Sequence, residues 1–283
     1  MSERLVREHG LLIATEAFGD PAHAPVLLIM GGGASLLWWP EEFCERLAGW
    51  GRYVIRFDQR DTGRSTKVVA GDPPYTLDDL AADAVRVLDA YAIPAVHLVG
   101  MSLGAIIGQL IALHHPTRVR SLTAISSSPF GVDTSRLPRS SEAYQQHLAT
   151  AEHVDWSDRE QVIEYSLAES RLIAGTAHPF AEDATRAFYE RDYDRSGGYS
   201  TLANFEWRGG DEWRGRLHEM NAPLLVIHGT ADPVYPIAHG VALADAVAGA
   251  KLVRLDGGGH ELHRATWDPI IDAIVAHTPQ GGG

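Results

Sequence analysis

Short apolar runs recur along the chain, and segments with a helical repeat of apolar side chains follow most of them. In the first 129 residues, the runs expected to form strands are residues 11–17, 25–30, 53–58, 95–100 and 119–126. The segments expected to form helices are residues 40–50, 77–91 and 105–114. Buried strands that alternate with helices predict a mostly parallel sheet with helices packed on both faces.

This alternation stops after residue 129 and returns near residue 221. The helical segments expected in between are acidic and poor in strongly apolar side chains, at residues 141–153, 158–173 and 179–193. The remaining elements are strands at 222–228 and 250–255, helices at 236–248 and 266–277, and a tail at 280–283. We therefore expect an α/β core from residues 1–129 and 221–283, into which residues 130–220 insert as a helical lid (cap).

The composition is that of an ordinary globular protein, with 283 residues, 45% hydrophobic and 22% charged. The net charge is −13 and no cluster of Lys and Arg is present, which argues against nucleic acids and anionic membranes as partners. The N-terminus lacks the apolar segment of a signal peptide. No apolar run approaches the roughly 18 residues that a membrane span needs.

The chain has one cysteine, Cys44, in the expected helix at 40–50. One cysteine cannot form an internal disulfide, which fits a reducing compartment, and we therefore expect a cytoplasmic protein. We expect Cys44 to be a buried structural thiol. The sequence leaves open whether the protein is a monomer or a homodimer.

The most informative stretch is Gly100-Met101-Ser102-Leu103-Gly104, a G-x-S-x-G that joins an expected strand directly to an expected helix. In this context the serine is expected on a sharp, strained turn with positive φ, which exposes its hydroxyl group. The flanking glycines fit such a turn because a Cβ atom there would clash. The alternative is a loop whose serine only caps the helix. The strand and helix on either side favour a nucleophile.

Asp232 and His260 also follow expected strands, and the carboxyl ends of parallel strands meet at one edge of a sheet. A serine hydroxyl needs a base within hydrogen-bond reach. That base needs an acid to fix its tautomer and to stabilise its charged form. We predict a catalytic triad in which Ser102 is the nucleophile, His260 the base and Asp232 the partner of the base.

Three nearby residues are weaker candidates for these roles. His263 is expected to be a surface or supporting residue, and His228 is expected to help pack the turn that contains Asp232. Asp256 lies too near its own strand end to orient His260 comfortably. Asp232 taken alone would be a turn residue, and only the order of the three residues on separate strand ends favours the catalytic interpretation.

Backbone N–H groups are expected to stabilise the oxyanion of the tetrahedral intermediate. The predicted donors are the amide of Leu103, at the start of a helix, and the amide of Gly32, in the glycine run at 31–33. One alternative for the glycine run is a phosphate-binding turn, which is disfavoured because no nucleotide-binding glycine pattern is present. The other is a plain structural turn.

Two further groups of residues have a structural interpretation. Residues 58–61 form a polar cluster in which we expect a buried Arg60 and its carboxylates to hold loops at the sheet edge. No His shares this cluster, so a metal is disfavoured, and we expect neither a metal nor a cofactor. The aromatic residues that either line an apolar pocket or simply pack are Trp38, Trp39, Phe130, Phe205 and Trp207.

Together these features resemble the α/β-hydrolase superfamily everywhere outside residues 130–220. The motifs are MGGG, FDQRDTGRS, VGMSLG, GTADP and GGGH. The MSER start, LLIMGG, WPEEF, RDTGRST and DLAADAV further resemble aclacinomycin methylesterase-type bacterial hydrolases of polyketide tailoring. The resemblance implies hydrolysis of a methyl ester on an anthracycline and puts Gly32 and Leu103 on oxyanion positions. Residues 130–220 share no recognisable similarity, and Met30 stands where the commoner motif has His.

We therefore predict a serine hydrolase that cleaves a small-molecule carboxylic ester through an acyl-enzyme intermediate. A methyl ester of a polyketide or other natural product is the substrate that the resemblance implies. Other reactions open to the same site are those of an aminopeptidase, a lactonase, a C–C bond hydrolase and a perhydrolase. A non-catalytic binding protein would not need all three triad residues. A dinucleotide-binding oxidoreductase would need a fingerprint that this sequence lacks.

Overall fold

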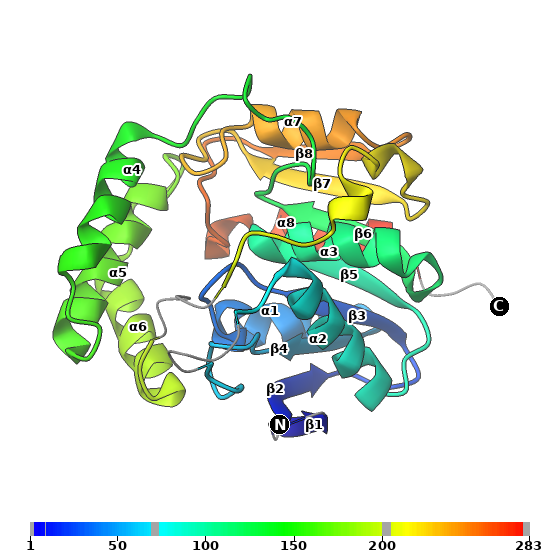
Figure 1. The fold of residues 1–283 in the computed structure, drawn as a ribbon, viewed down its shortest axis with the longest axis horizontal. Coiled ribbons are helices and arrows are strands. Elements are labelled where there is room, and N and C mark those ends of the chain that lie inside the picture. Colours follow the sequence, from blue (N-terminus) through cyan, green and yellow to red (C-terminus); the bar gives the residue numbers. More distant parts are fainter. Residues whose placement is uncertain (1–2, 9, 69–73, 200–204, 280–283) are drawn as a thin grey trace.

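An eight-stranded sheet runs through the centre of the computed structural model (Figure 1). The structure describes residues 3–8, 10–68, 74–199 and 205–279, and the predicted tail at 280–283 lies outside them. The strands are β1 (Arg4–Glu8), β2 (Leu11–Phe18), β3 (Ala24–Ile29), β4 (Arg52–Phe57), β5 (Val96–Met101), β6 (Val119–Ile125), β7 (Leu224–Gly229) and β8 (Lys251–Leu255).

The strand order in the sheet is β1-β2-β4-β3-β5-β6-β7-β8. Strands β3 to β8 pair in parallel, whereas β1 and β2 run antiparallel at one edge. The mostly parallel sheet agrees with the prediction from the sequence, but β1 was not predicted. That strand is short and buries only Val6, so it carries no apolar run.

Helices cover both faces of the sheet, as predicted. The α-helices are α1 (Glu41–Gly49), α2 (Leu77–Ala90), α3 (Leu103–His114), α4 (Glu142–Ala149), α5 (Arg159–Ile173), α6 (Glu182–Ser196), α7 (Ala238–Asp245) and α8 (Trp267–His277). The short 3-10 helices are Leu36–Trp38, Pro116–Arg118, Thr150–His153, Asp211–Trp213, Leu217–Glu219 and Arg264–Thr266. One apolar cluster joins the sheet to α2, α3 and α7, and a second joins it to α1 and α8.

Helix α3 is the most deeply buried element of the fold. Every residue from Leu103 to Leu113 is buried, because the helix lies directly against the central strands. Helix α2 is amphipathic instead, and Thr76 begins it with the predicted N-cap, which forms a reciprocal capping box with Asp79. None of the helices in the described part of the chain combines the length and the apolar character needed to cross a bilayer.

Residues 130–220 contribute α4, α5 and α6, which stack beside one end of the sheet (Figure 1). No strand of the sheet comes from the described residues of this segment. Phe130, Leu217 and Met220, near its two ends, belong to the same apolar cluster as the core strands. The ends of the segment thus pack into the core, and α4 to α6 extend beyond the sheet (Figure 1). We call α4, α5, α6 and their connections the inserted helices.

Candidate active site

Ser102 occupies the sharp turn between β5 and α3. Its φ of 52° and ψ of −121° are unusual for a residue with a side chain. The flanking glycines are required by contact distance: a Cβ atom on Gly100 would lie 2.4 Å from the Gly104 carbonyl oxygen. A Cβ atom on Gly104 would lie 2.1 Å from the carbonyl oxygen of Ile29. The predicted strained turn is therefore present, and neighbouring backbone on both sides enforces it.

The glycine run after β3 lies beside this serine. A Cβ atom on Gly31 would come within 3.4 Å of the Ser102 Cβ atom. Gln59 supports the run by donating from Nε2 to the carbonyl oxygen of Met30 over 2.7 Å. The loop is thereby held next to the end of β5.

A small cavity lies at the same place, and both Gly32 and Leu103 line it. Leu103 is the first residue of α3, where a backbone N–H has no partner within the helix. The structure therefore brings the two predicted oxyanion residues to one cavity beside Ser102. Other lining residues are Gln59, Arg60, Thr62, Tyr75 and Phe205.

Asp232 and His260 meet at the ends of β7 and β8. His260 Nδ1 lies 2.8 Å from Asp232 Oδ2, and the Asp232 side chain is fully buried. Its other oxygen accepts the N–H groups of Val234 and Tyr235 over 2.8 and 2.9 Å. Burial alone would raise the pKa of the Asp232 carboxyl, but the hydrogen bond and charge of His260 outweigh it and hold the pKa below its usual range. This arrangement fixes a carboxylate against one nitrogen of the imidazole.

The three predicted triad residues follow β5, β7 and β8, which run in parallel, so they lie at the same edge of the sheet. No hydrogen bond joins Ser102 Oγ to His260 in the described part of the chain. Such contacts are commonly long when no substrate is bound. The backbone of Ser102 is fixed more tightly, because its N–H donates to Ile125 and its carbonyl accepts from Ser127.

The rival residues occupy supporting positions. His228 is buried, and its Nε2 lies 2.7 Å from the carbonyl oxygen of Tyr235, which braces the Asp232 turn as predicted. Burial lowers the pKa of His228. Asp256 is exposed and makes no hydrogen bond to His260 within the described residues. His263 is half-buried and stacks on His178, with ring centroids 4.6 Å apart.

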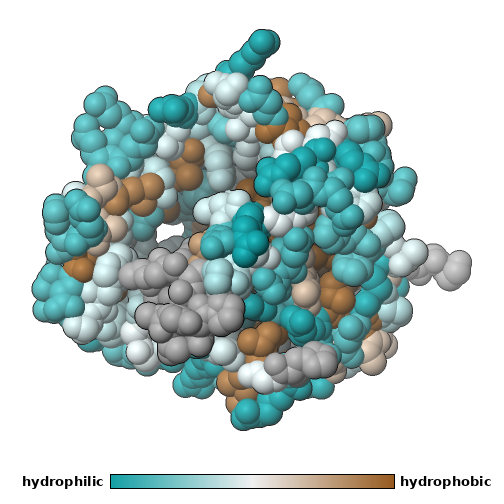
Figure 2. Space-filling model, viewed as in Figure 1, coloured by the Kyte–Doolittle hydropathy of each residue, from teal (hydrophilic) through white to brown (hydrophobic). Residues whose placement is uncertain are grey.

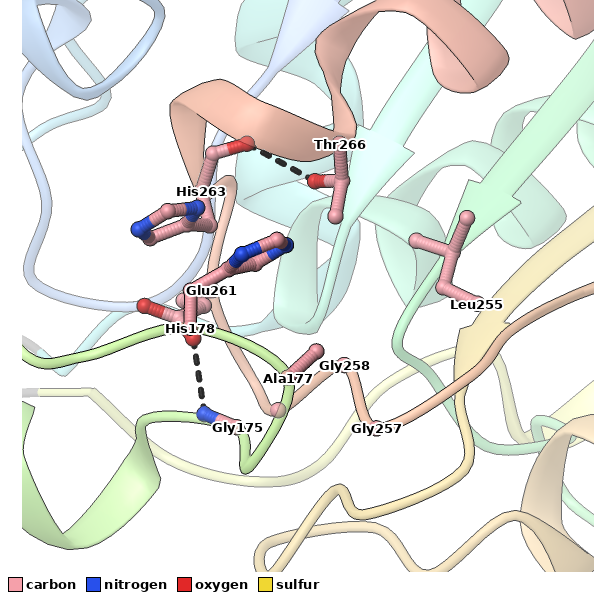
Figure 3. Close-up of a pocket in the computed structure, with 10 residues that line it drawn as sticks. Gly175, Ala177, His178, Leu255, Gly257, Gly258, Glu261, His263 and Thr266 are labelled. Carbon is pink, nitrogen blue, oxygen red and sulfur yellow. Dashed lines mark hydrogen bonds between the residues drawn. The ribbon is translucent and has the colours of Figure 1, made fainter.

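The His260 loop is attached to the inserted helices, which sequence reasoning did not foresee. The His260 N–H donates to the carbonyl oxygen of Ile173, the last residue of α5, over 2.8 Å. Gly175 N–H donates to Glu261 Oε1 over 2.7 Å (Figure 3). Thr176 and Ala177 donate to the carbonyl oxygen of Gly257. A Cβ atom on Gly259 would come within 2.3 Å of backbone in residues 173–175, so the two loops require a glycine there.

Arg60 is buried, as predicted, but its partner is not in its own loop. Its guanidinium contacts both oxygens of Asp83 on α2, at 2.6 and 2.8 Å. Asp58 instead accepts the N–H groups of Leu36 and Arg64 and an ion pair from Arg195 of α6. The cluster therefore has structural contacts, and Asp58 joins α6 to the loops that follow β3 and β4.

The aromatic candidates divide between packing and lining. Trp39 and Phe130 are buried in the two apolar clusters, whereas Trp207 is 61% exposed. Trp38 donates to Asp192 of α6 through its ring nitrogen, and Phe205 lines the pocket beside Gly32. The pocket interpretation therefore holds for Phe205 among the five.

No group of three or more His, Cys, Asp or Glu side chains in the described residues is arranged to hold a metal ion.

Cys44 is buried, as predicted, and burial raises the pKa of its thiol to about 12. A thiol in this state is a poor nucleophile at neutral pH. Among the residues singled out from the sequence, the serine turn and the Asp232–His260 pair stand out chemically.

Comparison with known proteins identifies the family. The sequence matches the alpha/beta hydrolase fold over residues 24–263. It is 36% identical to rhodomycin D methylesterase DauP of Streptomyces sp. (strain C5) and 35% identical to rhodomycin D methylesterase DnrP of Streptomyces peucetius, each over 98% of both chains. A solved structure of a hydrolase from Pseudomonas aeruginosa PA01 is similar, with a TM-score of 0.73, 25% identity and 97% coverage of both chains. These findings confirm the resemblance carried by the motifs, and the chain belongs to the alpha/beta hydrolase fold family.

Proposed function

We propose that the protein is a serine hydrolase of carboxylic esters, with Ser102, Asp232 and His260 as its triad. The observation that carries the proposal is the 2.8 Å contact between Asp232 and His260, at the sheet edge where Ser102 occupies its strained turn. An imidazole oriented by a buried carboxylate has one nitrogen left to accept a proton from serine. The ester hydrolases among the relatives support the same reaction class.

The proposed reaction has two stages. Ser102 Oγ attacks the ester carbonyl carbon while His260 Nε2 takes the hydroxyl proton, and the N–H groups of Gly32 and Leu103 bind the resulting oxyanion. The intermediate collapses as the C–O bond to the alcohol breaks, and His260 gives the proton to the leaving alkoxide. Water then attacks the acyl-enzyme, His260 takes its proton, and the carboxylic acid leaves as Ser102 regains its hydrogen.

We propose that residues 130–220 act as the cap over this site and that the substrate is a methyl ester of a natural product. The names and coverage of the two rhodomycin D methylesterases support the substrate class. The space-filling view supports a bulky acyl group, because the surface is hollowed between the inserted helices and the core (Figure 2).

An active-site phosphonate probe with intact-mass readout tests the nucleophile. We expect one covalent adduct on the wild-type protein and none on Ser102→Ala. We also expect a loss of ester hydrolysis on the order of 10⁶-fold in that variant, as in triads that lose their serine. An unlabelled wild-type protein would overturn the proposal. Methanol release from methyl esters of graded acyl size, with rhodomycin D among them, then separates a methylesterase from lactonase, peptidase and C–C hydrolase activity.

A further inference from the structure

Helix α5 carries three acidic side chains, and one differs from the other two. Glu160 and Glu164 are exposed and form ion pairs with Arg186 of α6. Glu169 is half-buried, and no ion pair in the described residues includes it. Withdrawing a carboxyl group from water without a cationic partner is unfavourable. The surroundings of Glu169 therefore differ from those of Glu160 and Glu164, which lie in solvent beside a cation.

The contact between α5 and the His260 loop places Glu169 near the proposed base. The carbonyl oxygen of Ile173 accepts the His260 N–H, and Glu169 lies four residues earlier in the same helix. Glu169 is therefore about one helical turn from the end of α5 that contacts the His260 loop.

Helix α4 makes a matching contact with the loop of the proposed acid. Ser141, the N-cap of α4, donates its N–H to the carbonyl oxygen of Pro233 over 2.7 Å, one residue after Asp232. Tyr144 lies in the first turn of α4, and its hydroxyl donates to Glu169 Oε1 over 3.2 Å. We call Tyr144 and Glu169 the roof pair. It joins the two inserted helices that contact the Asp232 and His260 loops.

The electrostatics agree with this placement. Burial raises the pKa of the Glu169 carboxyl, and the Tyr144 hydrogen bond and the charge of His260 oppose that rise. Tyr235 packs against the proposed base, with its ring centroid 5.8 Å from that of His260, and its N–H donates to Asp232. The charge of His260 thus acts on the Glu169 carboxyl, which agrees with the contacts of α4 and α5 with the two loops.

We propose that Glu169, oriented by Tyr144, is a specificity-determining residue that accepts a hydrogen bond from a hydroxyl group near the ester carbonyl of the substrate. This inference rests on the proposed function. Tyr144 bonds to Oε1 of Glu169, and Oε2 has no hydrogen-bond partner among the described residues. A carboxyl oxygen is a strong acceptor for a hydroxyl group, and a polar site discriminates sharply against a substrate that lacks the matching group.

The test uses two methyl esters with one acyl skeleton, one with and one without a hydroxyl group on the carbon next to the ester-bearing carbon. For Glu169→Leu, we expect kcat/KM for the hydroxylated ester to fall about 10- to 100-fold, as for a lost hydrogen bond to a charged acceptor. For the ester without the hydroxyl group we expect little change. Tyr144→Phe keeps the acceptor and should retain most of the preference for the hydroxylated ester.

Glu164→Leu is the matched control, because Glu164 lies on the same helix and faces solvent. We expect it to leave both rates unchanged. A purely structural roof pair would make Glu169→Leu and Tyr144→Phe equivalent, with equal losses on both esters, and would overturn the inference. Unchanged discrimination in Glu169→Leu would overturn it as well. A wild-type protein that the phosphonate labels but that does not prefer the hydroxylated ester would refute the roof pair alone. An unlabelled wild-type protein would refute the proposed function too.

Discussion

The two halves of the proposed catalytic machinery are held in different ways. Ser102 follows the central strand β5, and the glycine run follows its neighbour β3. The carbonyl oxygen of Ile29 would contact any Cβ atom added at Gly104. The His260 loop follows β8, which is the edge strand of the sheet. It hydrogen-bonds to Ile173 and its neighbours in the inserted helices. The proposed nucleophile is thus fixed by the core, whereas the proposed base is fixed partly by residues far away in the sequence.

This difference separates stability from activity. Packing around the serine turn is backbone against backbone in the middle of the sheet, so a disturbance there acts on the whole fold. The His260 loop meets the inserted helices at the edge of the core, so a disturbance there moves the imidazole and leaves the sheet intact. We infer that substitutions in the inserted helices preserve activity only where the contacts with the His260 loop are kept.

The largest expected effect comes from Gly104→Ala. The new Cβ atom would lie 2.1 Å from the carbonyl oxygen of Ile29 and 2.6 Å from that of Met30, and strand backbone cannot move away easily. We expect the free energy of unfolding to fall by about 3 kcal/mol, measured by urea denaturation. Gly49→Ala is the control, because nothing lies within 4 Å of its Cβ position. Equal stability of the two variants would contradict the view that the core enforces the serine turn.

A smaller effect, on activity rather than stability, is expected for Gly175→Ala. Its Cβ atom would lie 2.3 Å from the carbonyl oxygen of Gly257 and 2.5 Å from Gly259 N, which pushes the two loops apart. We expect kcat/KM to fall about 10- to 100-fold, as for a catalytic group displaced by about 1 Å. The free energy of unfolding should change less than in Gly104→Ala. A variant with full activity would show that the inserted segment does not position His260.

The smallest expected effect is a change of stability with pH that comes from the Asp232 carboxyl beside His260. The pKa of Asp232 is lower in the folded protein than in the unfolded chain, where it is about 3.9. Its contribution to stability is therefore complete above that value and is lost as the pH falls through the lower, folded pKa. We expect the difference in Tm between the wild type and Asp232→Asn to shrink below about pH 4, measured by calorimetry. A difference that stays constant down to pH 2 would contradict a depressed pKa.

The sequence predicted most of the fold because its strongest signals are local. Apolar runs predicted β3 to β8, and Thr76 predicted the start of α2. Strand β1 was missed because an exposed edge strand buries only Val6 and needs no apolar pattern. The loop at 58–61 was interpreted as structural, with Arg60 buried, but the sequence did not identify Asp83 as the partner of Arg60. An ion pair between Arg60 and Asp83 on α2 leaves no trace in local spacing.

The sequence by itself determined the serine turn on which the proposed chemistry depends. A strand, a G-x-S-x-G turn and a helix in succession specify a serine on a strained turn, because backbone sterics at Gly100 and Gly104 admit no side chain. Only the tertiary structure decided how the proposed base is held and which inserted helices contact its loop. The contacts of His260 with Ile173, and of Tyr144 with Glu169, join segments brought together by packing rather than by sequence proximity. Local patterns record backbone geometry, whereas pairings across the fold depend on where the whole chain places each surface.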